Sequence, residues 1–339
     1  MKARFAKKRE KRRANLEAAK CFADEIITLN SAHSRVVLSD VCSSSSIIDW
    51  DSLPRGLDPC AEDHTKLTKP GRGIRKRQQI ESIVSHVLHV LENKTLLAGD
   101  MENGIETIVD FGAGTGHVGL ILAWILGAKA RIFCVDMVEK CKMGRKRLDA
   151  VNDELGAMLA LNQNLGEQHQ LLENVSFFDG GIECFELPEM TLGVSLHSCG
   201  HLTDLSLRFC LEHKAAFCFV PCCYGQLQHA TTSLYTCDQA SNMAKFADFD
   251  VVQSKKVKER THGDMGDDSE AICPFVRNIS MANPAFLNAK RCMIGIDLRR
   301  LRYHLDDIED KFSLEYSLHV SSLHPLCCSP KNNVVMGWR

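Results

Sequence analysis

Five short apolar runs, separated by longer segments expected to be helical, constrain the fold of this chain most strongly. Strands are predicted at Thr107–Phe111, Arg131–Asp136, Val175–Phe178, Leu192–His197 and Ala216–Pro221. The helices predicted between them include Val118–Leu126, Glu139–Leu165 and Leu202–Leu211. Strands that alternate with helices in this way indicate an α/β fold, with a mostly parallel sheet covered by helices on both faces.

Further elements are predicted on either side of this alternation. Apolar residues recur with helical spacing after residue 75, at Ile80, Ile83, Val84, Val87, Leu88 and Leu91. After the fifth strand, Phe286–Leu305 is predicted to be a helix, and Leu314–Leu323 and Asn333–Trp338 are predicted to be strands. Such a final hairpin-like pair implies a seven-stranded sheet whose last strand is antiparallel.

The sharpest local motif is the run of residues from Val109 to Gly119, which reads VDFGAGTGHVG. It lies at a junction of strand and helix, where ligands bind in doubly wound sheets. Glycines at 112, 114 and 116 permit a tight turn and a close approach of backbone to ligand. An incidental glycine turn and a nucleotide-dependent oxidoreductase are alternative interpretations, because a glycine triplet alone is a weak signal.

Two acidic residues and the Gly-x-Gly-x-Gly spacing of the loop favour S-adenosylmethionine as its ligand. Asp110 precedes the first glycine, where its charge would repel a pyrophosphate but suits an ammonium and a sulfonium. Asp136 ends the second strand and could accept hydrogen bonds from both ribose hydroxyls. Asp179 follows the third strand and could bind the adenine amine, or it could simply be a turn residue. The candidate cofactor-binding residues are Asp110, Gly112, Gly114, Thr115, Gly116, Asp136, Asp179 and His197. With the antiparallel last strand, they predict a class I (Rossmann-like) methyltransferase fold.

The first 20 residues are strongly basic. They contain nine Lys or Arg and two Glu, a net charge of +7, so the other 319 residues carry −9 of the total −2. A basic arm of this kind can contact phosphates or serve as a nuclear address, or it can be a solvated helix. We therefore consider RNA as a partner, bound through Lys2–Arg13 and through the cluster Arg72–Arg77. Residues 1–71 are predicted to form a basic helix and a Ser- and Pro-containing linker, and residues 72–339 the main domain.

The chain has 16 cysteines, but charged residues occupy the place of the apolar region of a signal peptide. Reduced thiols in the cytoplasm or nucleus are therefore expected. No membrane span is expected either, since no apolar stretch reaches about 18 residues. Several cysteines lie in loops after predicted strands, in the runs LHSCG (196–200) and PCCYG (221–225), and others precede the run SPKN (329–332).

Those runs, with Thr203-Asp204 between the first two, resemble the methyltransferase region of the glutathione S-transferase C-terminal domain-containing proteins of animals. The resemblance covers residues 72–339. The family that it indicates also includes a tRNA 2′-O-methyltransferase with related His-x-Cys-Gly and Cys-Cys patterns. It implies S-adenosylmethionine binding and favours RNA, possibly tRNA, as acceptor. The first 71 residues leave no room for a glutathione S-transferase domain and contain no zinc fingers, so the tRNA substrate is not carried over directly.

Few residues can be given catalytic roles from the sequence. Cys222 could be a nucleophile towards pyrimidine C5, and Tyr224 and Lys331 are weaker candidates, the latter for orienting a phosphate or hydroxyl. Asp204 could cap the next helix. The loop cysteines and His201 could bind a metal, but adjacent cysteines seldom chelate one ion well, so none is expected. An active methyltransferase is favoured, and a non-catalytic scaffold or partner subunit that keeps the fold is the alternative.

Overall fold

The computed structural model describes residues 2–33, 36–38, 47–61, 71–98, 104–161, 171–229, 234–248, 280–312 and 315–339. Part of the predicted linker lies outside these ranges. So do Leu314, predicted to begin a strand, and residues 162–165, predicted to end a helix.

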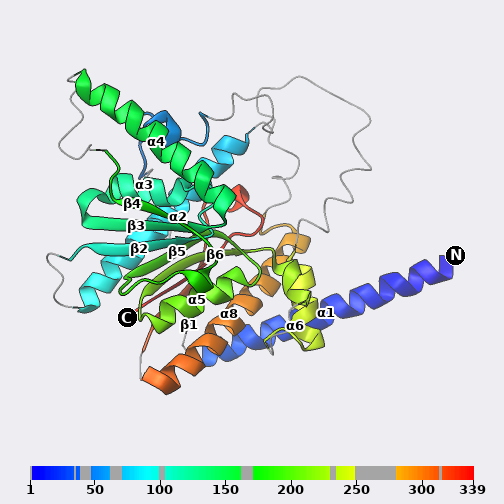
Figure 1. Cartoon of the computed structure of the whole chain (residues 1–339). Coiled ribbons are helices and arrows are strands. Elements are labelled where there is room, and N and C mark those ends of the chain that lie inside the picture. Colours follow the sequence, from blue (N-terminus) through cyan, green and yellow to red (C-terminus); the bar gives the residue numbers. More distant parts are fainter. Residues whose placement is uncertain are drawn as a thin grey trace, which may run out of the picture.

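An eight-stranded sheet forms the centre of the molecule (Figure 1). Its spatial order is β1-β7-β8-β6-β5-β2-β3-β4, and β8 runs antiparallel to both of its neighbours while the other pairs are parallel. This order, with the antiparallel β8, confirms the predicted class I methyltransferase fold. The eighth strand is the short β1, which pairs with β7 at the edge. The strands are β1 (Val36–Leu38), β2 (Glu106–Phe111), β3 (Ala130–Asp136), β4 (Val175–Asp179), β5 (Leu192–Cys199), β6 (Ala216–Cys222), β7 (Ser317–Ser322) and β8 (Asn333–Trp338).

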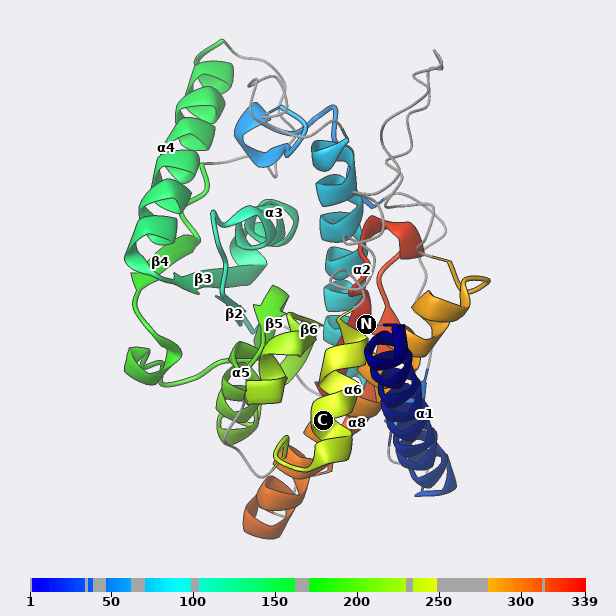
Figure 2. The same cartoon turned by 90° about the vertical axis from the view of Figure 1, so that its right-hand side faces the viewer.

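Helices cover both faces of the sheet (Figures 1 and 2). They are α1 (Lys2–His33), α2 (Arg72–Ala98), α3 (His117–Leu126), α4 (Val138–Ala160), α5 (Leu202–Glu212), α6 (Asp238–Ala247) and α8 (Pro284–Phe312). Short 3₁₀ segments are η1 (Arg55–Leu57), η2 (Gly127–Lys129), η3 (Ile182–Cys184), η4 (Tyr224–His229) and η6 (Leu326–Cys328). None of the helices within the described ranges is long and apolar enough to cross a membrane.

Two apolar cores follow from the period-two alternation of the strands. On β2, Ile108 faces a core shared with α2, α3 and α4, whereas Val109 and Phe111 face a core shared with α5 and α8. All three side chains are completely buried. Because both faces are covered, the strands lack the polar face of an exposed sheet, which explains why they appear as continuous apolar runs.

Residues before 72 pack onto the same body. In α1, Ala19 and Ala23 are buried in a cluster with α6 and α8, and Figure 2 shows these three helices side by side. Leu57 is also completely buried, in the core that contains α2. The sequence predicts a boundary at residue 71, but residues on both sides of it contribute to the same apolar clusters. The small side chains of Ala19 and Ala23 permit the close contact of α1 with α6 and α8. Residues 4–14 of α1 remain exposed.

Candidate active site

The glycine loop joins β2 to α3 at the carboxyl edge of the sheet. Gly112, Gly114 and Gly116 have φ values of 65°, 61° and 79°, which lie in the left-handed region that glycine adopts without steric cost. A Cβ at Gly114 would meet no atom within 4 Å, so a ligand can approach this part of the backbone. A Cβ at Gly112 would lie 2.7 Å from Cδ2 of Leu202, which shows that the start of α5 packs against the glycine loop.

Asp136 lies at the end of β3 and positions this loop. One carboxylate oxygen accepts a hydrogen bond from the Gly114 amide at 2.7 Å, and the other accepts one from the Met137 amide at 2.6 Å. The Gly112 amide donates to the Val135 carbonyl at 2.8 Å. β3 therefore supplies both the Val135 carbonyl that binds the loop and the Asp136 carboxylate that is predicted to bind the ribose.

Asp110 lies one residue before the end of β2 and is shielded from solvent. Its side chain is buried, and the Gly119 amide at the start of α3 donates to it at 3.1 Å. Desolvation raises the pKa of Asp110 to about 7, against the opposing effects of this hydrogen bond and of the positive charge of Lys76. Asp110 thus links β2 to the first turn of α3, and its contact with a ligand cation stays a prediction.

Two other candidates lie at the same edge. Asp179 at the end of β4 is aligned with Asp136 and forms an ion pair with Arg145 at 2.8 Å. The hydrogen bond from Arg145 lowers the pKa of Asp179. The hydroxyl of Thr115 forms a 3.1 Å hydrogen bond with Nδ1 of His117, in the first turn of α3. Both residues are therefore partly engaged by neighbouring side chains.

His197 occupies an irregular point of β5. Its φ of 82° is unusual for a residue other than glycine, and the pairing of β5 with β6 shifts register between Leu196 and Ser198. Nε2 of His197 forms a 3.2 Å hydrogen bond with Oε1 of Gln79. Burial, with the charges of Lys76 and Lys331, lowers the pKa of His197 to about 3, so the imidazole is neutral at pH 7.

The cysteines of the two loops after β5 and β6 come together. Sγ of Cys199 lies 3.1 Å from Sγ of Cys222 and 3.4 Å from Sγ of Cys223. The hydrogen bond with Cys222, aided by Cys223 and by the charge of Lys331 and opposed by desolvation, lowers the pKa of Cys199 to about 6. The same thiol pair raises the pKa of Cys222, so Cys199 is the more readily ionised of the two.

Tyr224 and Lys331, the two weaker catalytic candidates, each contact a carboxylate in the structure. Tyr224 is completely buried, and its hydroxyl donates to the Asp297 carboxylate at 2.7 Å. Nζ of Lys331 forms an ion pair with Asp248 at 2.8 Å. The positive charge of Lys331 also favours ionisation of Cys199, and a catalytic role for Lys331 stays a prediction.

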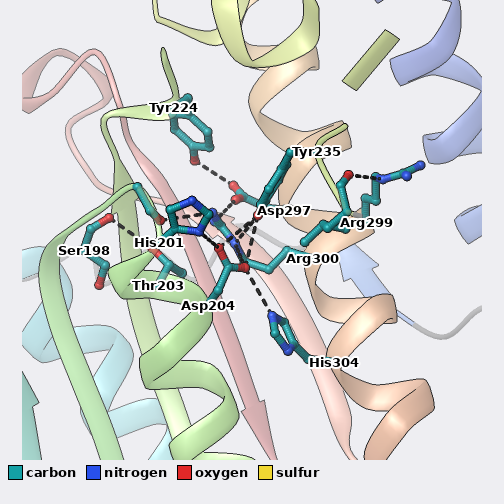
Figure 3. A network of polar contacts seen from close by, with 12 residues as sticks. Ser198, His201, Thr203, Asp204, Tyr224, Tyr235, Asp297, Arg299, Arg300 and His304 are labelled. Atoms are coloured by element: carbon teal, nitrogen blue, oxygen red, sulfur yellow. Dashed lines mark hydrogen bonds and ion pairs between the residues drawn. The ribbon is translucent and has the colours of Figure 1, made fainter. Parts of the chain in front are cut away.

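A buried polar network lies behind the loops after β5 and β6 (Figure 3). Nε of Arg300 donates to Asp204 at 2.9 Å, and Nη1 donates to Asp297 at 3.0 Å. Tyr235 and His304 also contact the Asp204 carboxylate, at 3.1 and 3.2 Å. The predicted helix cap by Asp204 is wrong, because Asp204 lies inside the first turn of α5 and its carboxylate is taken up by these side chains.

A buried lysine of α8, Lys290, binds the loop between β7 and β8. Nζ of Lys290 on α8 donates to Asn332 at 2.7 Å and to Ser322 at 2.8 Å. Asn332 also donates to the Leu326 carbonyl at 3.1 Å. Asn332 of the SPKN run therefore has a structural role in this loop.

Lys76 and Gln79 on the first turns of α2 are site residues that the sequence did not single out individually. The charge of Lys76 acts on Asp110 and His197, and Gln79 contacts His197 and the Cys328 carbonyl. The basic cluster Arg72–Arg77 that the sequence indicated includes Lys76 but not Gln79. Arg77 itself forms two hydrogen bonds with Asp58, at 2.7 and 2.6 Å.

Comparisons with known proteins agree with this geometry. Residues 75–230 match the family model described as a methyltransferase domain. The glutathione S-transferase C-terminal domain-containing proteins of Homo sapiens and Macaca fascicularis are each 30% identical over 292 residues, which is 86% of this chain and 36% of theirs. The homolog of Drosophila melanogaster is 27% identical over 86% of this chain and 40% of its own length. The chain thus spans little more than a third of the length of these relatives, and it carries a methyltransferase domain.

Solved structures are similar at lower identity. A putative S-adenosyl-L-methionine-dependent methyltransferase from Methanococcus maripaludis is 13% identical, with 81% of this chain and 96% of that chain covered and a TM-score of 0.31. A putative rRNA methylase from Clostridium thermocellum is 11% identical, with 74% and 94% covered and a TM-score of 0.33.

Proposed function

We propose that this chain is an active S-adenosylmethionine-dependent methyltransferase whose acceptor is RNA. The observation that carries the first part is the coupling of the glycine loop to Asp136, through the hydrogen bond from the Gly114 amide. This arrangement presents backbone and a carboxylate at the carboxyl edge of the sheet, where ligands bind in doubly wound folds. The open space at Gly114 fits a ligand that approaches the backbone closely.

The residues present fit this cofactor. Asp136 would hold the ribose, and the glycine loop would contact the amino acid end. Asp179, on the neighbouring strand, would lie towards the adenine. S-adenosylmethionine supplies a methyl group on a sulfonium, and the protein contributes mainly the alignment of that group with the acceptor. A neutral His197 adds no positive charge that would repel the sulfonium.

RNA is supported by the exposed basic half of α1. Residues 4–14 of this helix are exposed and project beyond its contact with α6 and α8 (Figure 1). Arg77 contributes less to phosphate binding, because its guanidinium is paired with Asp58. The N-terminal half of α1 is therefore the stronger candidate for the phosphate contacts.

Calorimetric titration with S-adenosylmethionine tests the cofactor. Wild-type protein should bind one equivalent, and Asp136→Ala should lower the affinity by about 10- to 100-fold, since a hydrogen bond to a charged group is worth about 1.5–3 kcal/mol. Asp149→Ala, an exposed residue of α4, is the matched control and should bind as wild type does. A wild-type chain that binds no cofactor would favour the non-catalytic scaffold.

Transfer of a labelled methyl group to an RNA pool tests the acceptor. Replacement of Lys7, Lys8 and Lys11 by Gln should weaken RNA binding and reduce its salt slope by up to about 0.7 per lost contact. The same change at three exposed lysines elsewhere should leave the slope unchanged; these are Lys129, Lys146 and Lys214. Cofactor binding without methyl transfer to RNA, or RNA binding with no salt dependence, would reject the RNA part alone.

A further inference from the structure

Three thiols form a compact cluster at the carboxyl ends of β5 and β6. The Sγ atoms of Cys199, Cys222 and Cys223 are separated by 3.1, 3.4 and 3.7 Å. In the described part of the chain, they are the one group of three or more His, Cys, Asp or Glu side chains close enough to hold a single metal ion. Cys199 is exposed, so the cluster can be reached from solvent.

Backbone geometry brings the three thiols together. Cys199 is the register partner of Cys222 across the β5–β6 pair, just after the shift in register at His197. Neighbouring residues of an extended strand point to opposite faces, so Cys222 and Cys223 would ordinarily diverge. Cys223 instead has a φ of 52°, a left-handed conformation that is uncommon outside glycine. We expected no metal here because adjacent cysteines seldom chelate one ion well, and this conformation removes that objection.

We propose that Cys199, Cys222 and Cys223 bind one zinc ion through their three thiolates. Tetrahedral zinc with Zn–S distances of about 2.3 Å requires sulfur atoms about 3.8 Å apart. The observed separations are up to about 0.7 Å shorter, a difference that small side-chain rotations can supply. Thiolates select soft ions such as zinc over magnesium or calcium.

Within the described ranges, no further His, Cys or carboxylate joins the three thiols, so no described residue fills the fourth coordination position. Three protein ligands with a free position are typical of catalytic rather than structural zinc sites, in which water or a ligand completes the tetrahedron. The centre would carry a net charge of −1, which the positive charge of Lys331, felt by both Cys199 and Cys223, partly offsets.

This site lies beside the glycine loop but does not depend on methyl transfer. Leu202, three residues after Cys199, packs against Gly112, and the charge of Asp136 also acts on Cys199. A ligand bound at the open position would therefore lie at the same edge of the sheet as the cofactor-binding residues. Zinc binding can be measured on a chain that has no acceptor and no S-adenosylmethionine.

The test is a cobalt titration of the reduced, chelator-treated full chain. Co²⁺ should give thiolate-to-cobalt charge-transfer absorption that saturates at one ion per chain, and Zn²⁺ should remove it by displacement while Mg²⁺ should not. Cys199→Ser should lower the affinity by more than about 100-fold, because even changes behind a ligand cost 10- to 100-fold. Added imidazole should shift the visible cobalt bands if the fourth position is open.

Matched variants keep the result interpretable. Cys184→Ser, at an exposed cysteine of η3, should titrate as wild type does. Cys199 is also exposed, so Cys199→Ser is expected to fold, which far-ultraviolet circular dichroism checks. The proposal is overturned if wild-type protein shows no charge-transfer absorption or if Cys199→Ser retains it. Formation of a Cys199–Cys222 disulfide by a chain that binds no cobalt would identify a redox pair instead.

Discussion

The glycine loop and the buried polar network differ in where their parts come from along the chain. Asp110, the three loop glycines and Asp136 lie within 27 consecutive residues. Both carboxylates accept hydrogen bonds from amides of the same stretch, Asp136 from Gly114 and Asp110 from Gly119. The network joins Asp204 of α5 to Arg300 of α8, 96 residues later, together with tyrosines from the segments between them (Figure 3).

The two regions also use charge differently. In the loop, Asp136 is partly accessible and binds backbone amides, so it can exchange one of these partners for a ligand hydroxyl. In the network, Arg300 and Asp297 are buried and satisfy one another. The first arrangement suits ligand binding, and the second suits holding α8 against the loops after β5 and β6.

Among the predicted changes, removal of the Arg300 guanidinium from the network should lower the free energy of unfolding most. Arg300→Met removes the buried guanidinium that pairs with both Asp204 and Asp297, which is expected to cost about 3–5 kcal/mol in the free energy of unfolding. Urea denaturation measures this loss. Arg302→Met on the same helix removes an exposed arginine, 65% accessible, and should change stability by no more than about 0.5 kcal/mol. Equal losses in both variants would show that the network does not stabilise the fold.

The second prediction concerns the pH dependence of the loop region. The pKa of Asp110 is raised by burial from 3.8 to about 7, so the folded state binds more protons than the unfolded state between these values. Stability attributable to Asp110 is therefore fully present below pH 3.8 and lost as the pH rises through 7, at up to about 1.4 kcal/mol per unit.

Asp110→Asn should remove this dependence. The variant should gain on the order of 2–4 kcal/mol relative to wild type between pH 4 and pH 8, as measured by urea denaturation across that range. Asp149→Asn, on the exposed face of α4, should follow the wild-type profile. A wild-type profile that rises with pH over this window would contradict the assignment of a buried, protonated Asp110.

The sequence predicted the loop well because its geometry is local. A glycine triplet after an apolar run and an acidic residue at the end of the next strand follow from φ requirements and strand direction. Apolar runs likewise predicted seven of the strands, and the final hairpin-like pair predicted the antiparallel β8. The short β1 was not predicted, and α8 extends to Phe312 rather than ending at Leu305.

The network could not be predicted in this way. Arg300 and Asp297 appear in the sequence as ordinary charged residues of an amphipathic helix, and only the packing of α8 buries them. The thiol cluster was half predictable, because the carboxyl ends of neighbouring strands meet at one edge. The left-handed backbone at Cys223, which directs its thiol to the others, has no signal in residue type or spacing.

A third prediction separates Tyr224 from the catalytic role considered for it. Tyr224→Phe removes the hydroxyl that donates to buried Asp297 and should cost about 1–3 kcal/mol in unfolding free energy. Its affinity for S-adenosylmethionine should equal that of wild type, because the hydroxyl points into the network. Tyr303→Phe, at a tyrosine that is 47% exposed on α8, should alter neither quantity. Weaker cofactor binding by Tyr224→Phe alone would move this residue back to the site.

The smallest loss of stability is expected for Gly114→Ala, a variant that distinguishes an effect on folding from an effect on cofactor binding. Gly114 and Gly127 both have a positive φ, 61° and 52°, and a Cβ at either would meet nothing within 4 Å. Gly114→Ala should cost about 1–2 kcal/mol of stability because of its positive φ. Gly127→Ala should cost at least as much, because its ψ of −134° lies outside the left-handed helical region, in a conformation that few residues other than glycine adopt. Calorimetric titration should then distinguish them. Only Gly114→Ala places its methyl group where the ligand would approach, so its affinity for S-adenosylmethionine should fall while that of Gly127→Ala is retained. If both variants kept full affinity, the open space at Gly114 would not be the cofactor site.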